Sequence, residues 1–285
     1  MTEKHVQRNY RDTLFRMLFR EKENLLSLYN AVNGTSYADG EGLEITTLEN
    51  AVYMNYKNDI SFVFDFELML YEHQSTVNPN MPLRDLIYVT KVLQGIIRNE
   101  NLYSSMLIKL PTPRFVVFYN GTDFQPREQT LRLSDSFQKE LERPELELIV
   151  TVYNINWGCN TELMEACRLL KEYAQYVERV RSLAKELPFP DAVEKAVDYC
   201  IQHGILAEFL LKNRVEAIEM SIFEYDEEKY LKSEREVWRN EGRREGEERF
   251  SRLLQCLQEE GRNEDINRAI AEPEYREQLY AENGL

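Results

Sequence analysis

Three polar residues within one short stretch have the types and spacing that metal-dependent chemistry requires. Asp59 opens a run of alternating apolar and polar residues over 59–64, and Glu72 and Gln74 close a second run over 68–74. Alternation with a period of two predicts two short strands joined by a tight turn. With the turn centred between Asp65 and Phe66, antiparallel pairing places Asp59 opposite Glu72.

Two interpretations of this hairpin end remain open. Cross-strand partners have Cβ atoms about 5 Å apart, so Asp59 and Glu72 are close enough to hold one divalent cation, with Gln74 on the same face. The alternative is that these groups line the solvent face of an ordinary hairpin. Like charges that face each other destabilise a sheet, and a cation is the simplest compensation. His73 is expected on the opposite face and outside the chemistry.

The composition is that of a globular protein, since 43% of the 285 residues are hydrophobic and 30% are charged. No stretch approaches 18 uninterrupted apolar residues, and the first residues lack the apolar run of a signal peptide, so we expect a cytoplasmic protein without a membrane span. The four cysteines are scattered with no CxxC pair, which disfavours disulfides and a zinc site. Any metal is therefore expected to bind oxygen ligands.

The charge is unevenly distributed along the chain. The net charge is −15, but the first 143 residues carry 16 basic and 19 acidic residues, so most of the acidity is C-terminal. Residues 84–143 have a slight excess of Lys and Arg. Binding of a polyanion such as DNA would therefore depend on a locally basic face and would be weak at physiological salt.

The remaining patterns predict an α/β fold with helices packed on one mixed central sheet. Apolar residues at helical spacing follow Asp12 and stop before Gly34, and Asp12 suits the cap or first turn of this helix. A strand at 43–48, the hairpin, a helix over 83–103 and two apolar strands at 114–121 and 145–156 come next. After Gly158 the pattern is entirely helical.

Arg84 and Tyr88 share one face of the helix over 83–103. Pro82 stands at the beginning of this helix, a position that favours proline. This helix begins near the chain that leaves Gln74, so Arg84 is placed to reach a phosphate. A surface salt bridge is the commoner role of such an arginine. We take Arg84, Tyr88 and Asp12 as candidate substrate-binding residues.

The segment over 227–261 predicts a long charged helix with opposite charges four residues apart, weakened by Gly242 and Gly246. An apolar stripe near its far end offers area to the body of the protein or to a second copy; it consists of Phe250, Leu253, Leu254 and Leu257. A solvated tail is the alternative. Each Arg of the segment has acidic neighbours and is a poor DNA anchor, so self-association through the tail is the use that we expect.

Six segments, taken in order, resemble the Rpn group of recombination-promoting nucleases, transposase-like members of the PD-(D/E)XK nuclease superfamily. They are DTLFRMLF, NDISF, LYEHQSTVNPNMPLRDLIY, PTPRFVVFYNG, VYNINWG and EGRREGEER, and they span about residues 12–260. The resemblance implies a PD-(D/E)XK nuclease-like core over residues 1–158, in which helices flank a mixed sheet. A helical region packed on the core over 159–225 and a charged helical tail over 226–285 would complete the chain.

The same resemblance implies a site and a reaction. In that superfamily an Asp starts one strand and an acidic-x-Lys pair ends the next, and the matching residues here are Asp59, Glu72 and Gln74. The reaction would be hydrolysis of DNA phosphodiester bonds with Mg²⁺, or Mn²⁺ in its place, bound by Asp59 and Glu72. Gln74 stands where the superfamily has Lys and can only orient a water by hydrogen bonding. A second hypothesis is therefore a catalytically weak or inactive nuclease-fold protein that binds DNA or another protein.

Overall fold

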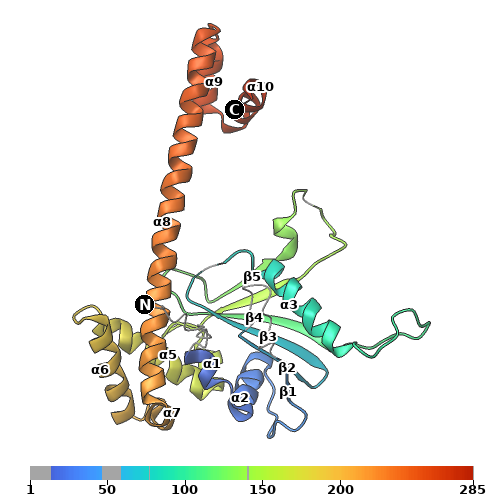
Figure 1. Ribbon diagram of the computed structural model, residues 1–285, viewed down its shortest axis with the longest axis vertical. Coiled ribbons are helices and arrows are strands. Elements are labelled where there is room, and N and C mark those ends of the chain that lie inside the picture. The colour runs from blue at the N-terminus through green and yellow to red at the C-terminus, as the bar shows by residue number, and fades with distance from the viewer. Residues whose placement is uncertain (1–13, 47–58, 77, 140, 285) are drawn as a thin grey trace, which may run out of the picture. The chain divides into compact units, whose positions relative to one another are not determined.

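A computed structural model describes residues 14–46, 59–76, 78–139 and 141–284, and the chain divides into two compact units, Met1–Tyr225 and Asp226–Leu285. The first unit is built on a six-stranded mixed sheet with the strand order β1-β2-β3-β4-β6-β5 (Figure 1). Its strands are β1 (Glu44–Ile45), β2 (Ile60–Phe64), β3 (Glu67–Gln74), β4 (Thr112–Tyr119), β5 (Glu128–Arg132) and β6 (Ile149–Asn154). The α/β class and the mixed sheet expected from the sequence are confirmed.

Strands β2 and β3 form the predicted hairpin. Its two-residue turn, Asp65 and Phe66, has φ angles of 47° and 61°. Positive φ at both turn residues is the mark of a type I′ turn, whose twist matches that of the flanking strands. The strands pair in the register that the sequence predicted, with Ile60 opposite Tyr71.

Strands β3, β4 and β6 run parallel to one another in the middle of the sheet. Helix α3 (Met81–Ile96) provides the crossover between β3 and β4, because parallel strands cannot be joined by a tight turn. The carboxyl ends of the three strands consequently meet at one edge of the sheet. Glu72 and Gln74 of β3 lie at this edge.

Helices cover both faces of the sheet. Successive side chains of β3 point to opposite faces, so they contact different helices. Leu68 and Leu70 belong to a buried cluster with residues of α3, whereas Met69 and Tyr71 belong to the larger cluster on the other face. The helices that contribute to the larger cluster are α1 (Leu14–Leu18), α2 (Lys22–Asn33), α4 (Thr161–Ala166), α5 (Arg168–Leu183), α6 (Phe189–Gln202), α7 (Ala207–Lys212) and the beginning of α8 (Arg214–Glu259). The side chains of Glu72 and Gln74 point to the same face of the sheet as that of Leu68, which is the face covered by α3.

The helix bounds differ from the expected ones in three places. The pattern before Gly34 forms two helices, α1 and α2, and Gly34 ends α2 with a φ of 66°, as a C-terminal glycine does. Helix α3 ends at Ile96 instead of continuing towards Tyr103, because the polar run at 98–101 offers no apolar side chain to the sheet. Beyond Gly158 the expected helix is interrupted at Cys167, between α4 and α5.

Strand β5 was not predicted from the sequence. It pairs with β6 at the edge of the sheet, and its residues alternate between exposed and partly buried positions. Polar residues fill most of it, so the apolar signal of a strand is weak there. The strand expected at 43–48 is shorter in the structure: β1 contains only Glu44 and Ile45, Leu43 and Thr46 flank it, and positions 47–48 lie outside the described residues.

The second unit contains most of helix α8 (Arg214–Glu259), which begins in the first unit, and the helices α9 (Asn263–Ala271) and α10 (Pro273–Asn283). Leu253 and Leu257 of α8 are buried against Ala269, Leu279 and Tyr280. Of the apolar stripe for which the body or a second copy was expected as partner, Phe250, Leu253 and Leu257 thus pack against the chain's own last two helices, and Leu254 is not in that cluster. No helix of the described ranges combines the length and apolar character of a membrane span.

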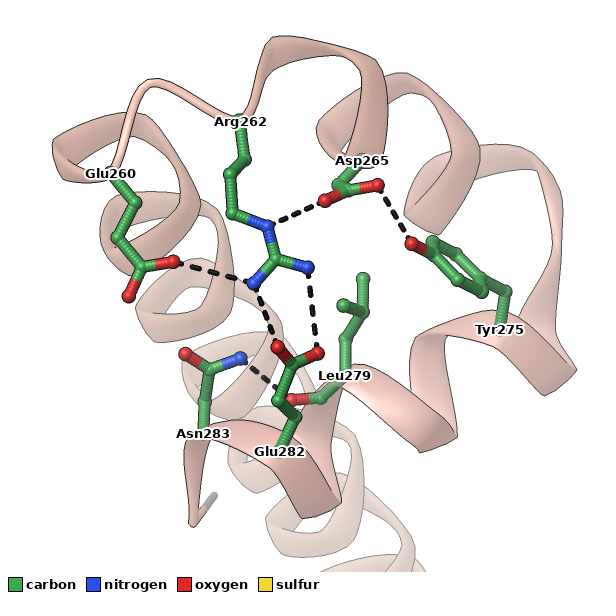
Figure 2. Close-up of polar contacts among 7 residues, drawn as sticks. All are labelled: Glu260, Arg262, Asp265, Tyr275, Leu279, Glu282 and Asn283. Carbon is green, nitrogen blue, oxygen red and sulfur yellow. Dashed lines mark hydrogen bonds and ion pairs between the residues drawn. The ribbon is translucent and has the colours of Figure 1, made fainter.

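Arg262 joins the three helices of the second unit (Figure 2). Its Nε donates to Asp265 Oδ2 at 2.5 Å, and its Nη1 donates to Glu282 Oε1 of α10 at 3.1 Å. Asp265 also accepts a hydrogen bond from the Tyr275 hydroxyl at 2.7 Å. The Arg262 guanidinium, in the turn after α8, therefore connects Asp265 near the start of α9 with Glu282 near the end of α10. Through Asp265 it is also linked to Tyr275 near the start of α10.

Candidate metal and phosphate site

The hairpin brings Asp59 to the carboxyl end of β3. Asp59 precedes the first residue of β2, and one further step of the observed register sets it beside Glu72. The backbone N–H of His73 donates to Asp59 Oδ2 at 2.8 Å, which fixes this carboxylate against β3. The cross-strand approach of Asp59 and Glu72 expected from the sequence is therefore present.

Glu72 is buried, with 3% of its surface exposed, and its Oε1 has no hydrogen-bond partner. Burial, followed by the charges of Asp59 and Asp85, raises the pKa of Glu72 well above its ordinary value, and Arg84 acts in the opposite direction. A buried carboxylate with a free oxygen and acidic neighbours is unstable as an anion unless a positive charge approaches it.

Helix α3 supplies the positive charge and a hydroxyl. Arg84 Nη2 lies 3.9 Å from Glu72 Oε2, and the Arg84 Nε is buried without a partner. The Tyr88 hydroxyl, one turn further along the same face, is also buried without a partner. Burial and the nearby Glu72 raise the pKa of Tyr88 against the opposing effect of the adjacent Arg84, so this hydroxyl keeps its proton and remains a donor. Arg84 and Tyr88 thus lie on one face of α3 near the carboxylate pair, and their expected contact with a substrate stays a prediction.

Asp85 belongs to the same cluster and was missed by the sequence analysis. It is 1% exposed, its Oδ1 has no partner, and burial raises its pKa to about 7. The signal was available, because Asp85 occupies a position on α3 where buried residues recur at helical spacing. Met81, Val89 and Val92 are its neighbours in that stripe, and all three are apolar.

Gln74 lies at the end of β3, on the same side as Glu72. Its side-chain Nε2 donates to Met81 Sδ at 2.6 Å, and its backbone oxygen accepts from the N–H of Asn120 at 2.9 Å. The amide nitrogen is directed at the first residue of α3. The other polar atom of the amide, Oε1, is the one to which a water could donate.

His73 faces away from the site, as expected. Its Nε2 lies 3.0 Å from the Tyr173 hydroxyl and its ring stacks on Phe15, with ring centroids 5.0 Å apart. Burial, with a smaller effect of Arg181, lowers the pKa of His73 to about 3, so the ring is neutral. The His73 ring therefore packs against the aromatic side chains of Phe15 and Tyr173 on the opposite face of the sheet.

Two expectations about the site stay predictions. Asp12 lies outside the described residues, so its expected contact with a substrate stays a prediction. No group of three or more His, Cys, Asp or Glu side chains that could hold a metal ion occurs in the described ranges. Mg²⁺ commonly takes only one or two carboxylates and keeps several waters, so a pair of carboxylates suits that ion.

Unpartnered polar atoms gather at this cluster. Eight buried side-chain nitrogen or oxygen atoms of the described residues lack a hydrogen-bond partner, and four of them belong to Glu72, Arg84, Asp85 and Tyr88. Two of the four are carboxylate oxygens, which accept, and two are the guanidinium Nε and the phenol, which donate. Buried polar atoms are normally satisfied, so the cluster has the form of a site for a ligand that carries both a cation and an anion.

Comparisons with known proteins give no relative to which this site could be matched. No protein-family model, no curated protein and no solved structure matches the chain. Functional conclusions therefore rest on the residues of the cluster and on the sequence resemblance.

Proposed function

We propose that this protein is a Mg²⁺-dependent DNA endonuclease, with Mn²⁺ as an alternative ion, that hydrolyses phosphodiester bonds in the manner of the recombination-promoting nucleases. The observation that carries the proposal is the gathering of unpartnered acceptors and donors at one buried cluster. Glu72 Oε1 and Asp85 Oδ1 lack a hydrogen-bond donor, while Arg84 Nε and the Tyr88 hydroxyl lack an acceptor. A divalent ion and a phosphate diester together supply both.

The residues of the hairpin fit a hard divalent ion. Asp59 and Glu72 offer oxygen donors from adjacent strands, and the buried Oε1 of Glu72 has no other partner. The ion would polarise the phosphate and lower the pKa of a bound water. Asp59 is already held by the His73 N–H, so little rearrangement of that carboxylate is needed.

Arg84 and Tyr88 would bind the phosphate. Both donors lie on one face of α3, and the guanidinium stands beside Glu72, where the ion would neutralise the carboxylate and release Arg84 to a phosphate oxygen. Arginine suits this task because its planar fork matches phosphate oxygens. Gln74, next to Glu72 on the same face, would accept a hydrogen bond from the attacking water through Oε1 and so orient it.

The resemblance to the Rpn group supports the same residues. It assigns Asp59 to the start of one strand and Glu72 with Gln74 to the end of the next; here Asp59 directly precedes β2, and Glu72 and Gln74 lie in the last three residues of β3. The near balance of charge in the first 143 residues is compatible with weak, salt-sensitive DNA binding.

A catalytically weak or inactive nuclease-fold protein that binds DNA or protein is the second candidate, and one contact favours it. Gln74 carries no charge, and its Nε2 is directed at Met81 instead of at the carboxylates. A lysine there would place a cation beside the attacking water, which glutamine cannot do.

Cleavage of supercoiled plasmid distinguishes the two candidates. The nuclease proposal predicts nicking that requires Mg²⁺ or Mn²⁺, stops with a chelator and is lost in Asp59→Asn and Glu72→Gln. Asp65→Asn, in the turn of the same hairpin, is the matched control and should cleave normally. Plasmid that stays intact with every ion, or is cut equally by Glu72→Gln, would overturn the proposal.

A further inference from the structure

An aspartate occupies a position on α3 that the helix otherwise reserves for apolar residues. Met81, Val89 and Val92 face the sheet and are buried, and Asp85 lies between them with 1% of its surface exposed. An unpaired carboxylate in such a place costs free energy, since its hydration is lost and its Oδ1 bonds to nothing. Binding of a ligand that donates a hydrogen bond to Asp85 would offset this cost.

The charges around Asp85 specify the kind of ligand. Asp85 and Asp59 both act electrostatically on Glu72, and Arg84 is the cation that opposes them there. When all three carboxylates are ionised, they exceed the one guanidinium by two negative charges, and burial of Glu72 and Asp85 opposes that ionised state until a cation binds. A monovalent ion would leave one of these uncompensated, whereas a divalent ion balances the cluster.

We propose that Asp85 is a positioning residue of this site, which accepts hydrogen bonds from the water shell of the divalent cation bound by Asp59 and Glu72. The inference rests on the proposed function and adds to it a third carboxylate, contributed by α3. In this role Asp85 binds the ion's water and not the ion itself. This agrees with the described residues, which include no group of three or more His, Cys, Asp or Glu side chains that could hold one metal ion. Mg²⁺ keeps several waters, and the free Oδ1 of Asp85 is an acceptor for one of them.

Asp85 would thereby link the ion to the helix that carries the phosphate-binding residues. Arg84 directly precedes Asp85, and Tyr88 follows three residues later. A water bound between the ion and Asp85 would therefore hold this part of α3 at a set distance from the hairpin. Residues that hold metal ligands or their waters typically contribute 10-fold to 100-fold in metal affinity. Asp85 is accordingly expected to determine preference for a divalent over a monovalent ion.

The test is calorimetric titration of Mg²⁺ and of Mn²⁺ into the full chain and into Asp85→Asn at pH 8, with the melting temperature measured without a divalent ion. Asp85→Asn has nearly the same shape but no charge. We expect its affinity to fall about 10-fold to 100-fold. Its melting temperature without the ion should stay equal or rise, since a like charge near Glu72 is removed. Asp135→Asn, an exposed aspartate, is the control and should change neither quantity.

The outcomes separate this inference from the proposed function. If Asp59→Asn abolishes binding but Asp85→Asn binds as tightly as the wild type, the role of Asp85 is wrong and the nuclease site stands. If Asp59→Asn still binds, the site itself is wrong. A lowered melting temperature with unchanged affinity would make Asp85 a purely structural residue and overturn the inference. Asp85→Ser, a smaller neutral variant, replaces Asp85→Asn if that variant does not fold.

Discussion

Arg84 Nη2 lies 3.9 Å from the buried Oε2 of Glu72, while the Arg84 Nε and the Glu72 Oε1 each remain without a partner. The two side chains are close enough to attract each other, but neither is satisfied by the contact. Each side chain of the pair can therefore bind a ligand in place of the other. A cation bound to Glu72 and an anion bound to Arg84 would give both charged groups a partner.

Arg84→Met should lower the free energy of unfolding without metal by about 1–3 kcal/mol at pH 8, because Glu72 is left buried without a counter-charge. In a Glu72→Gln background the same substitution should cost much less. Urea unfolding of the four proteins gives the coupling. Arg114→Met is the control, since Arg114 pairs with Glu67 at 3.0 Å in a more exposed place and should cost under about 1 kcal/mol. Equal costs in both backgrounds would show that Arg84 does not act through Glu72.

Gln74 should contribute to turnover and not to metal binding. Gln74→Ala is expected to lower the rate of plasmid cleavage by about 100-fold, since a group that orients the water is lost. Gln74→Lys should keep or raise the rate, because lysine adds a positive charge beside the water. Calorimetry should give wild-type Mg²⁺ affinity for Gln74→Ala. A rate equal to that of the wild type would remove Gln74 from the mechanism.

Acid sensitivity should come in part from His73. Its pKa is about 3 in the folded protein against 6.5 for an ordinary histidine, so the unfolded chain binds the proton more readily between these values. Stability is therefore fully present above pH 6.5 and is lost as the pH falls towards 3, by about 2 kcal/mol at pH 5. His73→Phe should lose less stability than the wild type between pH 7.5 and pH 5 in urea unfolding.

The exposed ring of His203 at the end of α6 provides the control for this measurement. His203→Asn should follow the wild-type dependence on pH. A His73→Phe protein that loses stability as steeply as the wild type would mean that other groups cause the acid sensitivity.

The hairpin turn contains a residue poorly suited to its backbone. Phe66 has a φ of 61° and is 86% exposed, so its side chain gains little from packing. Residues other than glycine cost about 1–2 kcal/mol in this conformation. Phe66→Gly should raise the free energy of unfolding by about 1 kcal/mol, whereas Tyr103→Gly, at a fully exposed loop position, should give no gain. A loss of stability in Phe66→Gly would contradict the assigned turn.

The sequence predicted those features that depend on local pattern. Alternation on both sides of Asp65 and Phe66 fixed the register of β2 and β3, and with it the approach of Asp59 to Glu72. The polar edge strand β5 escaped prediction because it carries little apolar pattern, and its position depends on pairing with β6. Local propensity says nothing of such long-range pairing.

Asp85 shows the same limit within the site. Its identity is visible in the sequence, but its burial depends on how α3 rotates over the sheet, and that rotation is set by tertiary packing. The stripe at Leu253 and Leu257 is a second case. Its apolar character was predicted, whereas the partners that cover it, α9 and α10, could not be chosen from the pattern of α8 alone.

Calorimetric titration of Mn²⁺ into the wild type and into Glu72→Gln measures whether the carboxylates of Asp59 and Glu72 bind a divalent cation. Glu72 is the most deeply buried carboxylate of the proposed ligand pair, and its Oε1 has no other partner. We predict one bound ion per wild-type chain, no detectable binding in Glu72→Gln and unchanged binding in Asp65→Asn. A wild type that binds no ion, or a Glu72→Gln protein that binds it equally well, would contradict the account.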